Sequence, residues 1–118
     1  NVLLADDSPL VSERLAAGLN SIVGVIVQAT ASSVQDAIAC TTRLLPDLVI
    51  LDPDLDGYQG HLVLEHIREH YRRIKVIILT NDNSVGNQTR YLAAGAYACL
   101  DKSLEFVRLR SIVKDLRA

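Results

Sequence analysis

Five short aliphatic runs divide this chain, and a longer segment of mixed polarity follows each of them. The runs are Val2–Ala5, Val25–Val27, Leu48–Leu51, Val76–Leu79 and Tyr97–Leu100. They do not alternate between apolar and polar positions, as strands with one solvated face would. Uninterrupted apolar runs of this length are typical of strands that are buried on both faces of a parallel sheet.

The intervening segments carry helix signals. Ser8 and Pro9 supply an N-cap and a first helical residue, and Ser33 caps a second helix that ends before Pro46. A more polar helix is expected over residues 83–94, closed by Gly95. The apolar positions expected to face the core are Val11, Leu15, Leu19 and Ile22 in the first helix, Val34, Ala37, Ile38 and Leu44 in the second, Leu62, Leu64 and Ile67 in the third, and Leu109, Ile112, Val113 and Leu116 in the last.

This regular alternation of strand and helix predicts an α/β fold. Five βα units with right-handed crossovers give a five-stranded parallel sheet with helices on both faces, which is a doubly wound three-layer sandwich. No repeat or linker interrupts the pattern, so residues 1–118 are expected to form a single domain. In such sheets ligands bind at the carboxyl ends of the strands.

Composition and charge narrow the function classes. Of 118 residues, 49% are hydrophobic and 22% charged, which is typical of a globular domain. The net charge of −2 and the lack of a Lys/Arg cluster argue against direct binding of nucleic acid or an anionic membrane. There is no membrane-spanning run, no signal-peptide pattern, and only two cysteines. A cytoplasmic location is the expectation that follows.

Polar residues suited to metal and phosphate chemistry follow four of the five runs. Asp6 and Asp7 come after the first run, Asp52 after the third, Thr80 after the fourth and Lys102 shortly after the fifth. A single aspartate at a strand end is more often a turn or capping residue, but four such strand ends together are unlikely to arise by chance. We expect these side chains to meet at one edge of the sheet.

Their chemistry points to a cation beside a phosphoryl group. Mg²⁺ prefers oxygen ligands and keeps several waters, so two or three carboxylates suffice to bind it. Adjacent aspartates on an extended strand end point in different directions, so Asp6 and Asp7 are expected to divide direct and water-mediated contacts. Asp52 is a candidate nucleophile that forms an acyl phosphate, with Lys102 and Thr80 contacting the phosphoryl oxygens.

Together these residues resemble the receiver domain of two-component response regulators, the CheY-like family. The resemblance covers Val2 to Leu116 and includes Leu3-Leu4-Ala5-Asp6-Asp7-Ser8, Pro46-Asp47-Leu48-Val49-Ile50-Leu51-Asp52, Gly60, Ile78-Leu79-Thr80, Gly95-Ala96 and Lys102. It implies a flavodoxin-like fold with strand order 2-1-3-4-5. It also implies a domain that stands alone or is a fragment of a longer regulator or hybrid kinase.

The resemblance assigns a role to each site residue. Asp52 would be the phosphoacceptor, Thr80 the switch hydroxyl and Lys102 the phosphate-binding lysine. Asp7 and Asp52 would bind Mg²⁺ (or Mn²⁺) directly, Asp6 mostly through water and Asp54 through its backbone carbonyl. The phosphoryl group would come from a sensor histidine kinase or a phosphotransfer protein. The domain would not be an enzyme, since it would catalyse only its own phosphorylation and dephosphorylation.

Several positions depart from the family pattern. Cys99 replaces the usual aromatic residue three positions before the lysine, and Ser103 replaces the usual proline after it, which makes a cis peptide bond doubtful. Asn81 follows the switch threonine, where a small residue is common, and is expected to narrow access to the phosphoryl group. Asp54 and Asp82 occupy positions that tune dephosphorylation in this family. Transmission of the signal is therefore expected to differ from the usual pattern.

Two alternatives remain open. The departures at Cys99, Ser103 and Asn81 fit a degenerate receiver that binds proteins independently of phosphorylation. The Asp52-x-Asp54 pattern also resembles haloacid-dehalogenase-like phosphatases, although there the nucleophile strand normally leads the chain and a cap domain is usual. In the receiver interpretation the partners include a downstream protein or output domain, and the last helices are a candidate homodimer surface.

Overall fold

The computed structural model describes residues 1–103 and 106–116, so the last two residues of the expected domain lie outside it. The order of elements is β1 (Val2–Ala5), α1 (Pro9–Asn20), β2 (Val27–Ala31), α2 (Val34–Leu44), β3 (Leu48–Leu51), α3 (Leu55–Tyr58), α4 (His61–His70), β4 (Lys75–Thr80), α5 (Val85–Ala93), β5 (Ala98–Asp101) and α6 (Phe106–Leu116). Within the described residues, the strands form one parallel sheet in the order β2-β1-β3-β4-β5. This confirms the α/β fold and the strand order 2-1-3-4-5.

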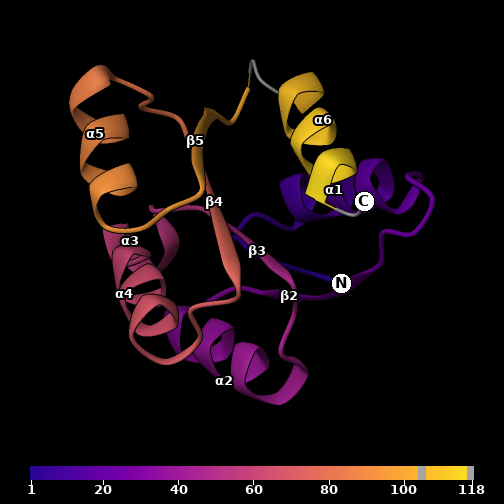
Figure 1. Cartoon of the computed structure of the whole chain (residues 1–118), viewed down its shortest axis with the longest axis horizontal. Helices are drawn as coiled ribbons and strands as arrows, with labels where there is room; N and C mark the ends of the chain where they lie inside the picture. Colours follow the sequence, from indigo (N-terminus) through magenta and orange to yellow (C-terminus); the bar gives the residue numbers. More distant parts are fainter. Residues whose placement is uncertain (104–105, 117–118) are drawn as a thin grey trace.

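Helices cover both faces of the sheet, as Figure 1 shows. α1 and α6 lie on one face, and α2, α4 and α5 lie on the other. Successive residues of β1 alternate between these layers: Leu3 and Ala5 belong to the core on the α4 side, and Val2 and Leu4 to the core on the α1 side. Both faces of the central strands are thus shielded from water, which explains why β1, β3 and β4 show no polar alternation.

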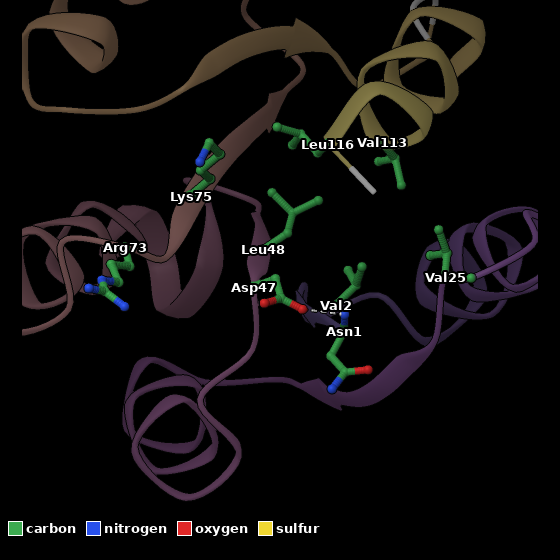
Figure 2. A pocket seen from close by; sticks show the side chains of 10 residues that line it. Asn1, Val2, Val25, Asp47, Leu48, Arg73, Lys75, Val113 and Leu116 are labelled. Carbon is green, nitrogen blue, oxygen red and sulfur yellow. Dashed lines mark hydrogen bonds and ion pairs between the residues drawn. The ribbon is translucent and has the colours of Figure 1, made fainter. Parts of the chain in front are cut away.

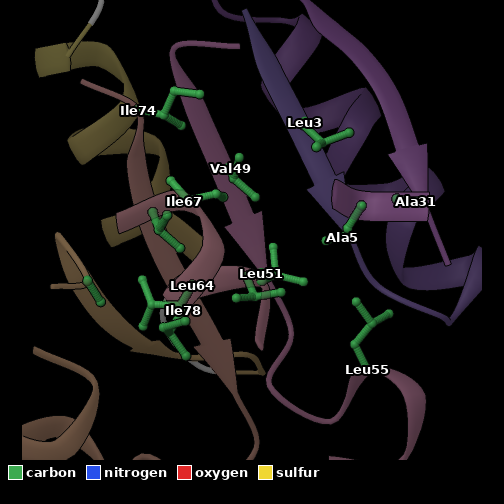
Figure 3. Packing of buried hydrophobic residues seen from close by; sticks show 14 of the residues in the cluster. Leu3, Ala5, Ala31, Val49, Leu51, Leu55, Leu64, Ile67, Ile74 and Ile78 are labelled. Atoms are coloured by element: carbon green, nitrogen blue, oxygen red, sulfur yellow. The ribbon is translucent and has the colours of Figure 1, made fainter. Parts of the chain in front are cut away.

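The core on the α4 side is continuous from the middle of the sheet to its carboxyl edge. Figure 3 shows Leu64 and Ile67 of α4 among strand residues such as Val49 and Ile78. Leu55 of α3 is also fully buried in this cluster, close to the point where the chain leaves β3. The residues that follow β3 are therefore held on a packed core.

Helix starts agree with the sequence signals. The hydroxyl of Ser8 accepts a hydrogen bond from the backbone of Val11, and that of Ser33 accepts one from Asp36. These are the side-chain caps that a helix needs for its unpaired first N–H groups. Gly95 follows α5 with a φ of 104°, a left-handed conformation that suits glycine at a helix end.

The second strand lies later in the chain than the sequence predicted. It runs over Val27–Ala31, so only Val27 of the expected run belongs to it, whereas Val25 is a buried loop residue and Ile26 is 60% exposed. The register pairs Ala31 with Ala5. β2 is an edge strand with a neighbour on one side only. It is therefore less buried than the central strands, and its sequence carries fewer apolar residues.

Two details of the helical pattern also differ. Leu62 was expected in the core but is 39% exposed, and Val63 is buried in its place. The turn α3 was not predicted from the sequence. Its residues Asp56 and Tyr58 have φ values of 53° and 69°, and the carboxylate of Asp56 accepts a 2.6 Å hydrogen bond from the backbone of Val34 at the start of α2. None of the described helices is long and apolar enough to cross a membrane.

Candidate functional site

The polar residues singled out in the sequence meet at the carboxyl edge of the sheet. Asp6 follows β1 and Asp52 follows β3, while Thr80 is the last residue of β4. All three are buried, which is unusual for the two aspartates. Lys102 follows β5, and its backbone N–H donates to the Thr80 carbonyl at 2.9 Å, which extends the β4–β5 pairing up to the site.

Three carboxylates converge at this edge. One oxygen from each of Asp6, Asp7 and Asp52 lies within 4.8 Å of the others, and Asp7 is the exposed member of the group. The chain bends at Asp7 immediately after β1, so the two neighbouring carboxylates converge instead of diverging as the sequence suggested. How they divide direct and water-mediated contacts stays a prediction.

Lys102 supplies the compensating charge. Its ammonium nitrogen lies 2.7 Å from Oδ2 of Asp6 and 2.8 Å from Oδ2 of Asp52. Backbone N–H groups hold the other oxygens, since Ser8 donates to Oδ1 of Asp6 and Asp54 donates to Oδ1 of Asp52, both at 2.9 Å. Burial would lower the pKa of Lys102, but the hydrogen bonds to the two carboxylates outweigh burial and raise it.

Asp54 stands at the rim of the carboxylate group. Burial, followed by repulsion from Asp52, raises the pKa of its carboxyl group above the ordinary value, although the nearby charge of Lys102 works in the opposite direction. Its backbone carbonyl, the expected metal ligand, accepts a hydrogen bond from the Tyr58 N–H at 3.1 Å. A carbonyl oxygen has two lone pairs, so this bond leaves room for a further ligand contact.

The Thr80 hydroxyl faces its own loop. It accepts a hydrogen bond from the Asp82 N–H at 3.0 Å and lies 3.4 Å from the Asp82 carbonyl. Within the described residues, Asp82 is its hydrogen-bond partner and Asp52 is not. A role for this hydroxyl at a phosphoryl group therefore requires it to turn.

The residues with expected tuning roles lie in the loop after β4 or next to it. Asn81 lines a cavity of about 650 Å³ together with Lys102 and Ser103, so its side chain borders the approach to the site. Ser103 follows Lys102 through a trans peptide bond, as the missing proline suggested. Cys99 is buried in β5, and its thiol lies 3.3 Å from Oδ1 of Asn83. This contact of Asn83 was not predicted, because a lone asparagine in a loop gives no sequence signal of its own.

Gly60 permits a close backbone approach beneath the phosphoacceptor position. A Cβ atom at this residue would lie 2.5 Å from the Asp52 carbonyl oxygen and 2.7 Å from Cα of Pro53. Both contacts are with backbone, so they could not be relieved by moving a side chain. The glycine eight residues after Asp52 is thus explained by packing against the segment that presents the carboxylate.

A second cavity, of about 380 Å³, lies at the opposite edge of the sheet, as Figure 2 shows. Asp47 lines it together with Arg73 and Lys75. Val2, Leu48 and Lys75, at the amino ends of three strands, line it. None of the site residues expected from the sequence lies there.

Comparison with protein families gives one match over nearly the whole chain. Residues 2–114 match the family model described as the response regulator receiver domain. The match includes all the residues described above, from Asp6 to Lys102.

Curated relatives are similar at a modest level. The chain is 30% identical over 117 residues to the transcriptional regulatory protein MalR of Bacillus subtilis, and 32% identical over 117 residues to the probable transcriptional regulatory protein TcrX of Mycobacterium tuberculosis. These alignments cover 99% and 96% of the chain, but only 50% and 49% of the two relatives. The chain thus spans about half the length of these proteins.

Solved structures share the fold throughout. The signal receiver domain of a putative LuxO repressor protein from Vibrio parahaemolyticus has a TM-score of 0.88 and 28% identity, with 98% of this chain and 88% of that chain covered. The signal receiver domain of a DNA-binding response regulator from Colwellia psychrerythraea has a TM-score of 0.89 and 26% identity, with 98% and 95% covered.

Proposed function

Since this chain belongs to the response regulator receiver domain family of two-component systems, we propose that it receives a phosphoryl group on Asp52. The observation that carries the proposal is the position of the Asp52 carboxylate, which is buried between the Lys102 ammonium group and the carboxylates of Asp6 and Asp7. A lone buried aspartate would be costly, whereas one placed among these groups has charge partners suited to phosphate chemistry.

The same group of side chains fits a divalent cation. The carboxylate oxygens of Asp6, Asp7 and Asp52 are close enough to share one ion, and repulsion from Asp52 adds to burial in raising the pKa of the neighbouring Asp54 carboxyl group. These residues and the Asp54 carbonyl would hold Mg²⁺ or Mn²⁺. When bound, the ion would offset the negative charge shared by the carboxylates and the incoming phosphoryl group.

The proposed transfer step needs one nucleophile and one donor. An Asp52 carboxylate oxygen attacks the phosphorus of a phosphohistidine, a P–O bond forms and the P–N bond breaks. The electron pair stays on the leaving imidazole nitrogen, and the product is an acyl phosphate on Asp52. Lys102 would move its ammonium group from the carboxylate to the phosphoryl oxygens, and Thr80 would turn from Asp82 to donate a hydrogen bond to one of them.

Labelling with a small phosphodonor tests this function directly. In the presence of Mg²⁺ we expect one phosphoryl group per chain, located on Asp52 by mass spectrometry and absent from Asp52→Asn. Removal of the metal with a chelator should abolish labelling. A chain that binds Mg²⁺ but is never labelled would instead be a degenerate receiver, and steady release of phosphate from a small phosphomonoester would favour a phosphatase.

The wider role is proposed from the family. Receiver domains interact with histidine kinases and with the output domains of response regulators, and the matched relatives are about twice as long as this chain. We therefore propose that a histidine kinase or phosphotransfer protein supplies the phosphoryl group and that the surface formed by α5, β5 and α6 contacts an output partner or a second copy. The domain would act as a signalling switch in the cytoplasm and not as an enzyme with its own substrate.

A further inference from the structure

Hydrogen bonds connect the loop of residues 81–84 to the end of β4 before it and to α5 after it. At its start the Asp82 N–H donates to the Thr80 hydroxyl at 3.0 Å. From α5, the side-chain amide of Asn87 donates to the Asp82 carbonyl at 3.0 Å and that of Gln88 donates to the Asn83 carbonyl at 2.9 Å. The polar character of α5, which weakened its helix signal in the sequence, thus has a use in holding this loop.

A third bond ties the middle of the loop to β5. The thiol of Cys99 donates to the side-chain oxygen of Asn83 at 3.3 Å. Cys99 is 8% exposed and belongs to the same core cluster as Tyr91 of α5. A thiol is a weak donor, but this one is buried and its bond to the half-buried Asn83 is partly shielded from water, where a hydrogen bond is stronger than at the surface.

These bonds bear on the Thr80 hydroxyl through a single short segment. To donate to a phosphoryl group on Asp52, the hydroxyl must leave the Asp82 N–H, which loosens the start of the loop. Asn83 is the next residue along, so a shift of the loop also pulls its side chain away from Cys99. The resting position of the Thr80 hydroxyl and the Cys99–Asn83 contact are therefore mutually supporting.

We propose that Cys99 and Asn83 form a latch that stabilises the resting position of this loop and opposes the turn of Thr80 toward Asp52. The proposal rests on the function proposed above and adds how that switch is restrained. Cys99 is a positioning residue here, since it acts through Asn83 and the loop and does not touch the reacting atoms. Any change that removes the latch should favour the state in which Thr80 faces Asp52, because it weakens only the competing state.

The test measures the affinity for beryllofluoride, a phosphoryl mimic, at saturating Mg²⁺ by backbone NMR. Removal of one weak hydrogen bond from the resting state should tighten the apparent affinity roughly two- to fivefold in both Cys99→Ala and Asn83→Ala. Cys99→Ser keeps a donor and should stay close to the unmodified protein. The double variant should be no tighter than either single variant, because both remove the same contact.

Two outcomes would overturn the latch. Unchanged or weaker beryllofluoride affinity in both single variants would mean that the contact does not restrain the switch, and additive effects in the double variant would mean that the two residues act separately. A purely structural role would lower the free energy of unfolding without tightening binding. Asn83→Ala lies in a loop and leaves the core intact, so it keeps the test decisive even if Cys99→Ala folds poorly.

Thiol alkylation gives a second readout with an internal control. Cys40 is also buried, in α2 and away from the loop. Release of the latch by beryllofluoride should accelerate alkylation of Cys99 relative to Cys40, and equal rates with and without the mimic would contradict release. If the unmodified protein neither binds beryllofluoride nor is labelled at Asp52, the proposed function fails; if it does both and the variants bind no tighter, only the latch fails.

Discussion

The ammonium nitrogen of Lys102 lies 2.8 Å from Oδ2 of Asp52, the residue whose carboxylate we propose as the phosphoacceptor. The same nitrogen lies 2.7 Å from Asp6, so one cation serves two buried carboxylates. A divalent ion and Lys102 would therefore seek the same oxygens. Because of this competition, removal of Lys102 is expected to affect metal binding and phosphoryl transfer in opposite directions.

Lys102→Met should bind Mg²⁺ more tightly and be phosphorylated more slowly. Removing the ammonium group removes its repulsion of the metal and frees two carboxylate oxygens, so the Mg²⁺ dissociation constant should fall. The rate of Asp52 labelling should drop by about 10²-fold or more, the usual cost of removing a group that stabilises developing charge. Titration calorimetry and a labelling time course would measure the two effects.

The matched control for that variant is Lys75→Met, which removes an exposed lysine from the start of β4 at the opposite edge of the sheet. It should change neither the Mg²⁺ dissociation constant nor the rate of Asp52 labelling. A loss of Mg²⁺ affinity in Lys102→Met would contradict the competition, and would indicate that the lysine mainly organises the carboxylates.

Mg²⁺ should stabilise the folded protein, because Asp6, Asp7 and Asp52 converge only after folding. At a free concentration 100 times the dissociation constant, the free energy of unfolding should rise by about 2.7 kcal/mol, which urea denaturation can measure. A chelator should reverse the gain and Asp7→Asn should abolish most of it. Glu69→Gln, an exposed change on α4, should retain the full gain; an equal gain in Asp7→Asn would place the ion elsewhere.

Stability without metal should depend on pH through Asp54. Its pKa is raised in the folded protein by burial and by Asp52, so the folded state binds this proton more tightly than the unfolded chain does. Ionised Asp54 therefore opposes folding at pH 7, and this opposition disappears as the pH falls below the ordinary pKa of 3.8.

Asp54→Asn should accordingly be more stable than the unmodified protein at pH 7 in the presence of a chelator. The advantage should shrink as the pH falls toward 3.8, where the native carboxyl group is protonated too. Urea unfolding across a pH series would show this, with Asp115→Asn on the exposed side of α6 as the control. A gain that is the same at every pH would assign the effect to something other than charge.

The sequence predicted the fold well because its strongest signals are the buried strands. Asp6, Asp52 and Lys102 could be placed together without coordinates, since each follows an apolar strand and parallel strands present their carboxyl ends to one edge. The edge strand β2 was misplaced for the same reason: it is partly exposed, so its sequence lacks the continuous apolar character that marked the others.

What the sequence could not supply is side-chain direction. Thr80 was expected at the phosphoryl group, yet its hydroxyl is bonded to Asp82, and Cys99 is linked to Asn83 by a contact that joins residues 16 positions apart. Such contacts depend on rotamers and loop geometry, which no periodicity encodes. The left-handed conformation of Asp56 likewise depends on its bond to Val34 at the start of α2, far away in the sequence.

Gly60 offers a final prediction, on the support of the phosphoacceptor. In Gly60→Ala the new methyl group would lie 2.5 Å from the Asp52 carbonyl oxygen, and the backbone there must move to relieve it. We expect a loss of about 1–3 kcal/mol in the free energy of unfolding, measured by urea denaturation, and slower labelling of Asp52.

Gly86→Ala is the matched control, because a Cβ atom at this position in α5 meets nothing within 4 Å. Alanine favours a helix interior over glycine by about 1 kcal/mol and gains less in the first turn, where Gly86 lies, so that variant should be as stable as the unmodified protein or slightly more so, with unchanged labelling. If both variants lost labelling equally, close packing beneath Asp52 would not be what positions its carboxylate.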